Sequence, residues 1–488
     1  MNDLSKTLEA VKLARQQPLP EDLAKSFSQA TGLVNYDLQA PALLLFPALT
    51  PLRNRIPRVA GNGGLATVWK QITAINPTNM RAGVAEGKRG GIITDATAEK
   101  TAAYRGIGLE NSVTFEATYA AAGFDDAKAK AALTLLTSVM IQEESIILGG
   151  NGTNGIALGT TPTPTVATST SGGTIPAATY NVICVALTLA AWRAATVSGG
   201  LQLTASRTNA DGTSDTVAGG HAAKSTAASQ VTTGSTSTIS ASVAAVNGAV
   251  AYAWYLGTSG NELLAAITSI NSVLLSTVAA GTQNASVLTG GDQSKDTLVF
   301  EGLLTQIMTS GSGAYNVALP TGVAGTGTVL TSDLAGGCVQ IETALASFWD
   351  NARLSPSEMM MSASMLISLN TLIIKNGGAP LIRFNANLGD SSFSAGTVVG
   401  SYLNKVTNAL LKVTVIPDMP NGMILFYSDS IPYAVSNVPN LVQIKTRQDY
   451  YQTEWPLRTR AYEFGIYADE LLQVYFPPAF GVLRNIAV

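Results

Sequence analysis

The chain has 488 residues, of which Lys and Arg make up 29 and Asp and Glu 32, so that its formal net charge is −3. This near balance argues against a protein that mainly coats nucleic acid, because such binding requires a cationic surface. Charged residues form only 12% of the chain, about half the usual share, and this low charge suits a surface that meets protein partners over much of its area.

The sequence carries no signal for export or for crossing a membrane. Residues 1–6 are polar and charged, unlike a secretory signal, and the most apolar run, residues 182–192, is shorter than the ~20 residues that span a bilayer. We therefore expect a soluble chain with no membrane partner. Cys184 and Cys338 lie far apart without CxxC spacing, which excludes a cysteine-based zinc site and predicts buried thiols, with a bridge between them left open.

Residues 1–50 begin with an amphipathic helical pattern that ends before two prolines. Because this stretch holds too little apolar surface to fold alone, we expect an arm that lies on another surface or stays mobile. A basic run follows, at Arg53, Arg55 and Arg58. It fits a solvated or ion-paired surface strip, or contact with DNA or an acidic neighbour.

Residues 64–116 are typical of a two-stranded ribbon, with strand patterns at 66–69 and 113–116. Its polar, glycine-rich middle carries Arg81, Lys88 and Arg89. Since an isolated two-stranded ribbon is marginally stable in water, we expect it to lie across another subunit.

The clearest helix spans residues 125–148, where apolar residues recur at three- and four-residue spacing and two glycines stop it. Adjacent aspartates favour its N-terminus, and we expect Glu143 and Glu144 to lie on a solvated or ion-paired face. The G-x-G-x-x-G pattern at 150–155 follows this helix rather than a strand. It therefore predicts a helix stop and a flexible turn instead of a dinucleotide site.

Residues 151–290 have a different composition, with only six charged side chains. Short β-type runs separated by turn signals predict a small β-sandwich, with a loosely ordered surface extension as the alternative. These runs are 180–187, 201–206, 250–256 and 272–278. The segment 248–257 resembles a central strand of immunoglobulin-like or fibronectin-type modules.

After residue 295 the helical patterns return, with one helix marked by Ile341, Leu345 and Phe348 and a second over residues 365–373. Five further strands are predicted, at 411–416, 423–427, 442–446, 458–467 and 471–476. The chain therefore reads as an α+β body interrupted by an all-β insertion.

Nothing in the sequence points to catalysis. His221 is the single histidine and lies in a Gly/Ala/Ser/Thr-rich stretch, where we expect a solvated loop residue. No HExxH, GxSxG or Walker A pattern occurs, so we expect no catalytic residues, no cofactor and no metal site.

The layout resembles that of the major capsid proteins of tailed double-stranded DNA bacteriophages, which have the Hong Kong 97-like fold. The resemblance covers residues 1–156 and 295–488. It is carried by the order of the elements, by the helix-to-glycine junction at 143–153, by Phe-Glu-Gly-Leu at 300–303, and by the closing segments 458–467 and 474–483.

The resemblance implies a subunit of seven parts. These are an N-terminal arm (1–50), a peripheral-domain segment (51–63), an E-loop (64–112), the peripheral domain with its spine helix and glycine-rich turn (113–156), an inserted immunoglobulin-like β-sandwich (157–293), an axial domain (294–435) and the last peripheral-domain strands (436–488).

The function that the resemblance implies is a structural one, with no enzyme activity. Subunits would assemble into hexamers and pentamers that form an icosahedral head around packaged double-stranded DNA, bound without sequence specificity. Portal, scaffolding and decoration proteins would be further partners, and the shell would form in the bacterial host cytoplasm before residing in the virion. Some relatives crosslink an E-loop lysine to a neighbour, but no motif fixes a partner for Lys88, so we expect no crosslink.

Eight charged residues are candidates for contacts between subunits: Arg53, Arg55, Arg58, Arg81, Lys88, Arg89, Glu143 and Glu144. The main alternative function is an encapsulin-like compartment shell, which shares the fold without a genome. A surface-layer or adhesin protein, and a glycosidase with a carbohydrate-binding module, are the alternatives from other classes.

Overall fold

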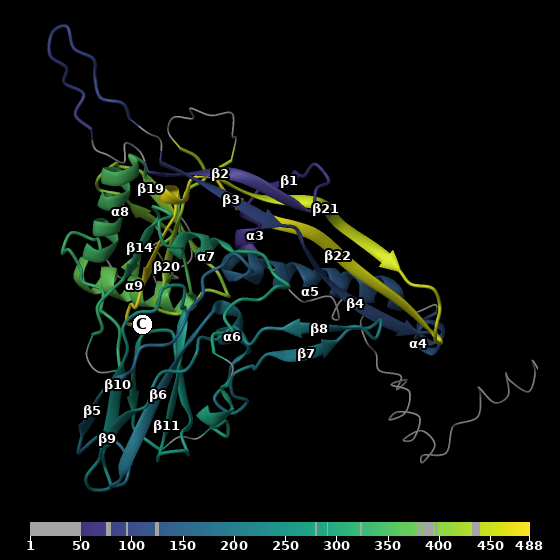
Figure 1. Ribbon diagram of the computed structural model, residues 1–488, viewed down its shortest axis with the longest axis horizontal. Helices are drawn as coiled ribbons and strands as arrows, with labels where there is room; N and C mark the ends of the chain where they lie inside the picture. The colour runs from purple at the N-terminus through teal and green to yellow at the C-terminus, as the bar shows by residue number, and fades with distance from the viewer. Residues whose placement is uncertain are drawn as a thin grey trace, which may run out of the picture. The chain divides into compact units, whose positions relative to one another are not determined.

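The computed structural model describes residues 50–74, 80–93, 96–122, 126–278, 281–289, 291–322, 325–377, 382–383, 394–395, 399–431 and 440–488. The predicted N-terminal arm, apart from Thr50, lies outside these ranges. The chain divides into two compact units, the smaller of which includes residues 110–137 and 453–465 and the larger residues 49–109, 138–452 and 466–488. Helices and strands alternate without a repeating βα order (Figure 1), which confirms the α+β class.

The first sheet has the strand order β1-β21-β22-β4. Its strands are β1 (Arg58–Ala60), β21 (Val442–Glu454), β22 (Ala461–Val474) and β4 (Arg105–Thr114). The prediction of separate strands at 458–467 and 471–476 is wrong, because one continuous strand, β22, covers most of both. Its polar residues Asp469 and Glu470 break the apolar pattern but are paired with arginines, so the strand continues through them.

A ribbon is present, and its first strand, β2 (Ala66–Ala74), was predicted. Its partner is β3 (Ala96–Ala103), which pairs antiparallel from Ala66↔Ala103 onward, and not the predicted segment 113–116. The strand expected at 113–116 is wrong at its second half, since Phe115 begins α4 (Phe115–Ala121). The Thr114 side chain accepts a hydrogen bond from the Ala117 N–H at 3.2 Å, which caps and so starts the helix.

The predicted long helix is confirmed as α5 (Ala127–Gly149). The Asp126 side chain accepts hydrogen bonds from the N–H groups of Lys128 and Ala129, as an N-cap should. At the other end, a Cβ on Gly150 would lie 2.4 Å from the Phe300 carbonyl oxygen, so the chain can pass here only with glycine.

Residues 157–293 form a β-sandwich of two sheets, ordered β13-β10-β5 and β12-β11-β6-β9, with a separate hairpin of β7 and β8. The strands are β5 (Thr165–Ser169), β6 (Thr179–Leu187), β7 (Ala205–Thr208), β8 (Ser214–Val217), β9 (Ala228–Val231), β10 (Thr238–Ser242), β11 (Ala251–Gly257), β12 (Leu263–Thr268) and β13 (Ser272–Leu275). Side chains of both sheets, including Ile239, Val273 and Trp254, share one buried core. The prediction of a central strand at 248–257 is confirmed, since β11 lies between β12 and β6 and every residue of it is buried.

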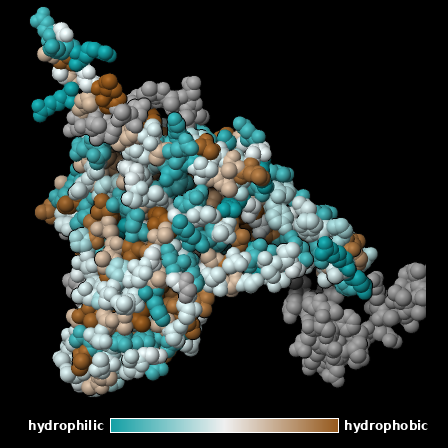
Figure 2. All heavy atoms as spheres, in the orientation of Figure 1, coloured by the Kyte–Doolittle hydropathy of each residue, from teal (hydrophilic) through white to brown (hydrophobic). Residues whose placement is uncertain are grey.

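The surface of this segment carries few charged side chains. It contains α6 (Leu189–Ala194) and the short turn η2 (Ala285–Val287) besides the strands. Figure 2 shows its spheres mostly in the pale colours of intermediate hydropathy, as its Ser, Thr, Ala and Gly content requires.

Several contacts fasten the sandwich to the rest of the larger unit, among them the following. The buried Arg484 guanidinium donates to the carbonyl oxygens of Val246 and Ala249 at 3.2 and 3.1 Å. The two chain segments that connect the sandwich to the body also lie side by side. Asn151 in the first segment donates a side-chain hydrogen bond to the carbonyl of Ser294 in the second, at 2.8 Å.

The remaining body is a six-stranded sheet ordered β14-β23-β20-β15-β19-β18. Its strands are β14 (Tyr315–Ala318), β15 (Glu358–Met361), β18 (Ser401–Leu403), β19 (Leu410–Val415), β20 (Ile424–Tyr427) and β23 (Gly481–Arg484). A short pair, β16 (Ile382–Arg383) and β17 (Ser394–Ala395), is also present. The turn η3 (Pro477–Ala479) precedes β23.

Helices α7 (Leu303–Met308), α8 (Val339–Ala352) and α9 (Ala363–Gly377) accompany this sheet, and Figure 1 shows α8 and α9 in green beside it. Both longer helices confirm the predicted ones. Ile341, Leu345 and Phe348 on α8 and Met365 and Leu369 on α9 are buried in a core shared with β15 and β20, as their spacing requires.

Candidate functional site

The ribbon β2–β3 ends in residues 80–93, every one of which is exposed. The predicted contact residues Arg81, Lys88 and Arg89 lie here. Among the residues that the structure describes, no carboxylate forms an ion pair with any of the three. Their charges are therefore available to a partner.

Apolar side chains accompany these cations. Ile92 is 84% exposed, and Val84 and Ile93 are about half exposed. At the base of the ribbon, Leu65 and Val68 are likewise exposed. Water-exposed apolar side chains gathered on one element mark a surface for contact with protein.

A cluster of charges with buried carboxylates at its centre and the exposed Asp449 at its edge lies where α5 meets β1, β21 and β22. The Arg58 guanidinium bonds to the Glu143 carboxylate at 2.5 Å, to the Glu470 carboxylate at 2.7 Å and to the Asp449 carboxylate at 2.7 Å. Arg53 bonds to Glu143 from the other side at 2.7 Å.

An aromatic ring completes this cluster. The Tyr450 hydroxyl donates to Glu143, and the guanidinium carbons of Arg53 and Arg58 lie 5.1 and 4.9 Å from the centre of its ring. Such stacking adds a cation–π attraction to the ion pairs.

The pKa values of two residues in this cluster, Glu470 and Arg58, are shifted. Burial, reinforced by the like charge of Glu143, raises the pKa of Glu470 to about 8, against the opposing effect of Arg58. Burial lowers the pKa of Arg58, but Glu470, Asp449 and Glu143 outweigh it, so that the pKa of Arg58 is raised overall.

Glu144 has a different role from Glu143. Its carboxylate accepts the backbone N–H groups of Leu52 and Arg53 at 3.1 and 2.8 Å, at the start of α3 (Pro51–Arg55). It thus supplies an acceptor for helix N–H groups that have no partner within the helix. Burial raises the pKa of Glu144, with the two N–H donors opposing.

The structure corrects the prediction for the two glutamates. Glu143 and Glu144 are 1% and 3% exposed, so neither lies on a solvated face, and Glu143 is ion-paired with Arg53 and Arg58, which was the other alternative. Arg53 and Arg58 are also paired within the chain, and Arg55 pairs with Asp429 and Glu358. The run 53–58 is therefore ion-paired, one of the alternatives that the sequence left open.

The prediction for His221 is wrong. The side chain is 1% exposed, and its Nδ1 lies 2.9 Å from the Ala222 carbonyl oxygen. Gly219 and Gly220 let the chain turn inward here beside β6. The predicted thiols, by contrast, are confirmed: Cys184 and Cys338 are free and buried, and burial raises the pKa of each.

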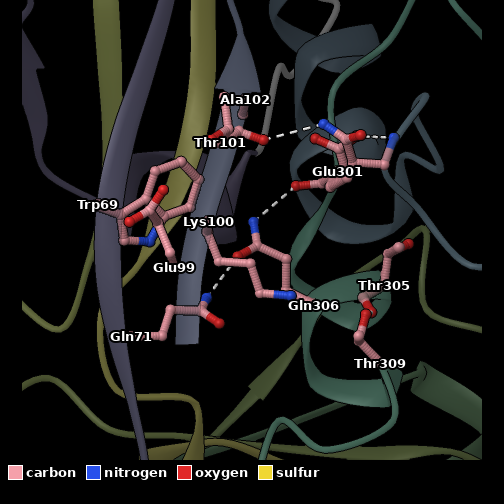
Figure 3. A pocket seen from close by; sticks show the side chains of 11 residues that line it. Trp69, Gln71, Glu99, Lys100, Thr101, Ala102, Glu301, Thr305, Gln306 and Thr309 are labelled. Atoms are coloured by element: carbon pink, nitrogen blue, oxygen red, sulfur yellow. Dashed lines mark hydrogen bonds between the residues drawn. The ribbon is translucent and has the colours of Figure 1, made fainter. Parts of the chain in front are cut away.

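A pocket of about 260 Å³ lies between the ribbon and α7 (Figure 3). Its polar side chains bond to each other: Gln71 Nε2 donates to Gln306 Oε1 at 3.4 Å, and the Gln306 amide donates to the Glu301 carbonyl at 2.9 Å. Asn154 joins the opposite wall, donating to the Thr101 carbonyl at 3.0 Å. These bonds tie the ribbon base to the body.

Groups that could hold a metal ion were sought among the described residues, and no cluster of three or more His, Cys, Asp or Glu side chains occurs there. Within the same residues, α5 is the one helix long and apolar enough to cross a bilayer by length and composition. Its last turns carry the ion-paired Glu143 and the fully buried Ile147 and Leu148, which is typical of a helix in a protein core.

Comparison with known proteins found no matching family model and no matching curated relative. Among solved structures, the chain is similar to the capsid of cyanophage A-1(L), with TM-score 0.41 and 13% identity over 94% of this chain and 97% of that one. It is similar to the SrpI encapsulin of Synechococcus elongatus PCC 7942, with TM-score 0.41 and 9% identity over 96% and 97%. A third is the capsid of the Myoviridae phage XM1, with TM-score 0.38 and 10% identity over 93% and 100%.

Proposed function

We propose that the chain is a shell protein, many copies of which assemble into a closed capsid. The observation that carries the proposal is the tip of the ribbon, residues 80–93, where exposed apolar side chains stand beside three exposed cations that form no ion pair with any described residue. A two-stranded ribbon is marginally stable alone, and burying its tip against a second copy removes apolar surface from water.

The finer proposal is the major capsid protein of a tailed double-stranded DNA phage. Its support is the element order that prompted the resemblance: ribbon, long helix, β-insertion, helix-flanked sheet and closing strands. Copies would form hexamers and pentamers of an icosahedral head in the host cytoplasm and then the virion, with portal, scaffolding and decoration proteins as partners. The seven residue ranges given above are proposed as its parts, and the packaged double-stranded DNA would be held without sequence readout.

Electron microscopy of the purified full chain tests the function. Hollow polyhedral particles or rings of capsomers are expected. Discrete monomers at every concentration would contradict a shell. Particles that form with protein cargo and never with DNA would favour the encapsulin-like alternative over a phage head.

The cations of the ribbon tip are proposed to meet acidic groups of a neighbouring copy. Replacing Arg81, Lys88 and Arg89 together with Ala should reduce particle yield at least several-fold. The chain should unfold at an unchanged temperature, because none of the three charged groups forms an ion pair with a described residue. The matched control is Arg81→Lys with Arg89→Lys, which keeps every charge and should assemble. Equal yields from the Ala and Lys variants would remove the proposed contact.

A further inference from the structure

Two buried carboxyl groups face each other across the α5–β22 contact. Glu143 on α5 is 1% exposed and Glu470 on β22 is fully buried. Both carboxyl groups bond to the same guanidinium, that of Arg58. Arg58 bridges them, with its two terminal nitrogens at 2.5 Å from Glu143 and 2.7 Å from Glu470.

One oxygen of the Glu470 carboxyl group is free to carry a proton. Glu470 Oε1 is buried and has no hydrogen-bond donor among the described residues. Two ionised carboxylates repel and cannot bond to each other, whereas a protonated carboxyl donates to its ionised neighbour. A single proton on this pair therefore removes the repulsion between two buried carboxylates that share one guanidinium.

The charges around the pair balance only when that proton is present. With Glu470 neutral, the positive Arg53 and Arg58 match the negative Glu143 and Asp449. The groups that face the pair come from α3, β1, α5 and β21: Arg53, Arg58, Glu143, Glu144, Asp449 and Tyr450. Glu144 is held separately by the backbone N–H groups of α3.

We propose that Glu143 and Glu470 hold one proton between them at neutral pH, and that its release in weakly alkaline solution loosens the attachment of the last turns of α5 to β22. The proton leaves the Glu470 carboxyl for water, and no other covalent bond changes. An excess negative charge then remains buried, which is unfavourable in a site of low polarity. This device acts within one chain and does not depend on the proposed function.

The sign of the effect follows from proton binding. Burial raises the pKa of Glu470 above the ordinary 4.5, so over the interval between the two values the folded chain holds a proton that the unfolded chain has lost. The stabilisation is therefore complete when the pH lies below the pKa of Glu470 in the unfolded chain. It is lost as the pH rises through the pKa of Glu470 in the folded chain.

The variant Glu470→Gln tests this proposal because an amide mimics the protonated carboxyl in shape and charge. Wild type and variant should unfold at nearly the same temperature at pH 6, and the wild type should unfold at the lower temperature at pH 9. Potentiometric titration should show the wild type releasing about one proton more than the variant between pH 7 and 9. Hydrogen exchange of residues 138–149 and 466–474, corrected for intrinsic rates, should speed up with pH only in the wild type.

Two further variants separate this mechanism from a general loss of packing. Glu143→Gln removes the like charge and should move the wild-type transition to lower pH. Glu358→Gln changes another buried carboxyl, which bonds to Thr414 and Lys412, and should leave the transition where it is. A Glu470→Gln chain that fails to fold, or that is weakened equally at pH 6 and pH 9, would overturn the proposal.

Discussion

At the scale of single residues, the buried arginine Arg58 organises the larger unit near α5. It bonds to three carboxylates, two of which are buried. Glu143 also bonds to Arg53, but Glu470 has no other cation among the described residues. Lone buried charges are unfavourable by several kcal/mol, whereas exposed pairs contribute little.

Arg58→Met should accordingly lower the free energy of unfolding by about 3–5 kcal/mol. Chemical denaturation at pH 7, followed by tryptophan fluorescence, measures it. The control is Arg447→Ala, which breaks the partly exposed pair with Asp469 and should change the free energy of unfolding by only about 0–1 kcal/mol. Similar losses in both variants would show that Arg58 has no special role.

The residues that sequence reasoning misplaced share one cause: their partners are remote. Glu143 bonds to side chains 90 and 307 positions away, so no local pattern shows that it is buried. One signal was present, since Glu143 and Glu144 interrupt a helix that is apolar on most of its length. His221 was misplaced because its polar, glycine-rich surroundings are typical of loops, while the fold turns them inward.

At the scale of elements, helices were predicted well and strands less well. The helices α5, α8 and α9 follow from apolar spacing that repeats over three or more turns. Strands were predicted where β-branched residues run together, as in β6, or where aromatic residues do, as in β11. The pairing of β2 with β3 was not predictable, because strand partners are chosen by tertiary packing and not by local sequence.

The attachment of the β-sandwich gives a prediction at this scale. Arg484→Ala would leave the Ala249 carbonyl without its donor, at about 1–3 kcal/mol, and would leave the Val246 carbonyl with only the Ala249 N–H. We expect faster cleavage near residues 244–250 in limited proteolysis, and a lower unfolding temperature. Arg193→Ala is the control: it also links the sandwich to the body, through a less buried pair with Asp418, and should be cleaved little faster than wild type. If Arg484→Ala were cleaved at the wild-type rate, the sandwich would be held by other contacts.

At the scale of the whole molecule, the proposed shell depends on surfaces that a single chain leaves uncovered. Replacing Ile92 and Ile93 with Ser removes exposed apolar area from the ribbon tip without touching a core. Particles should then form poorly or dissociate at lower denaturant concentration, while the free energy of unfolding of the chain stays the same. Sedimentation velocity measures the assembled fraction.

The control for this double variant is Leu334→Ser. Leu334 is 80% exposed but lies outside the ribbon, so its replacement should leave assembly intact. Reduced assembly in both variants would point to general loss of surface hydrophobicity rather than to the ribbon tip.

The meeting of the two connections at Asn151 and Ser294 has a consequence for how such a chain can change over time. A module whose two ends sit side by side can be removed, lengthened or exchanged, and the junction can be closed by a short linker without stretching the scaffold on either side. The same geometry makes this junction a natural graft point, where a foreign domain with neighbouring termini could be displayed in place of the native one.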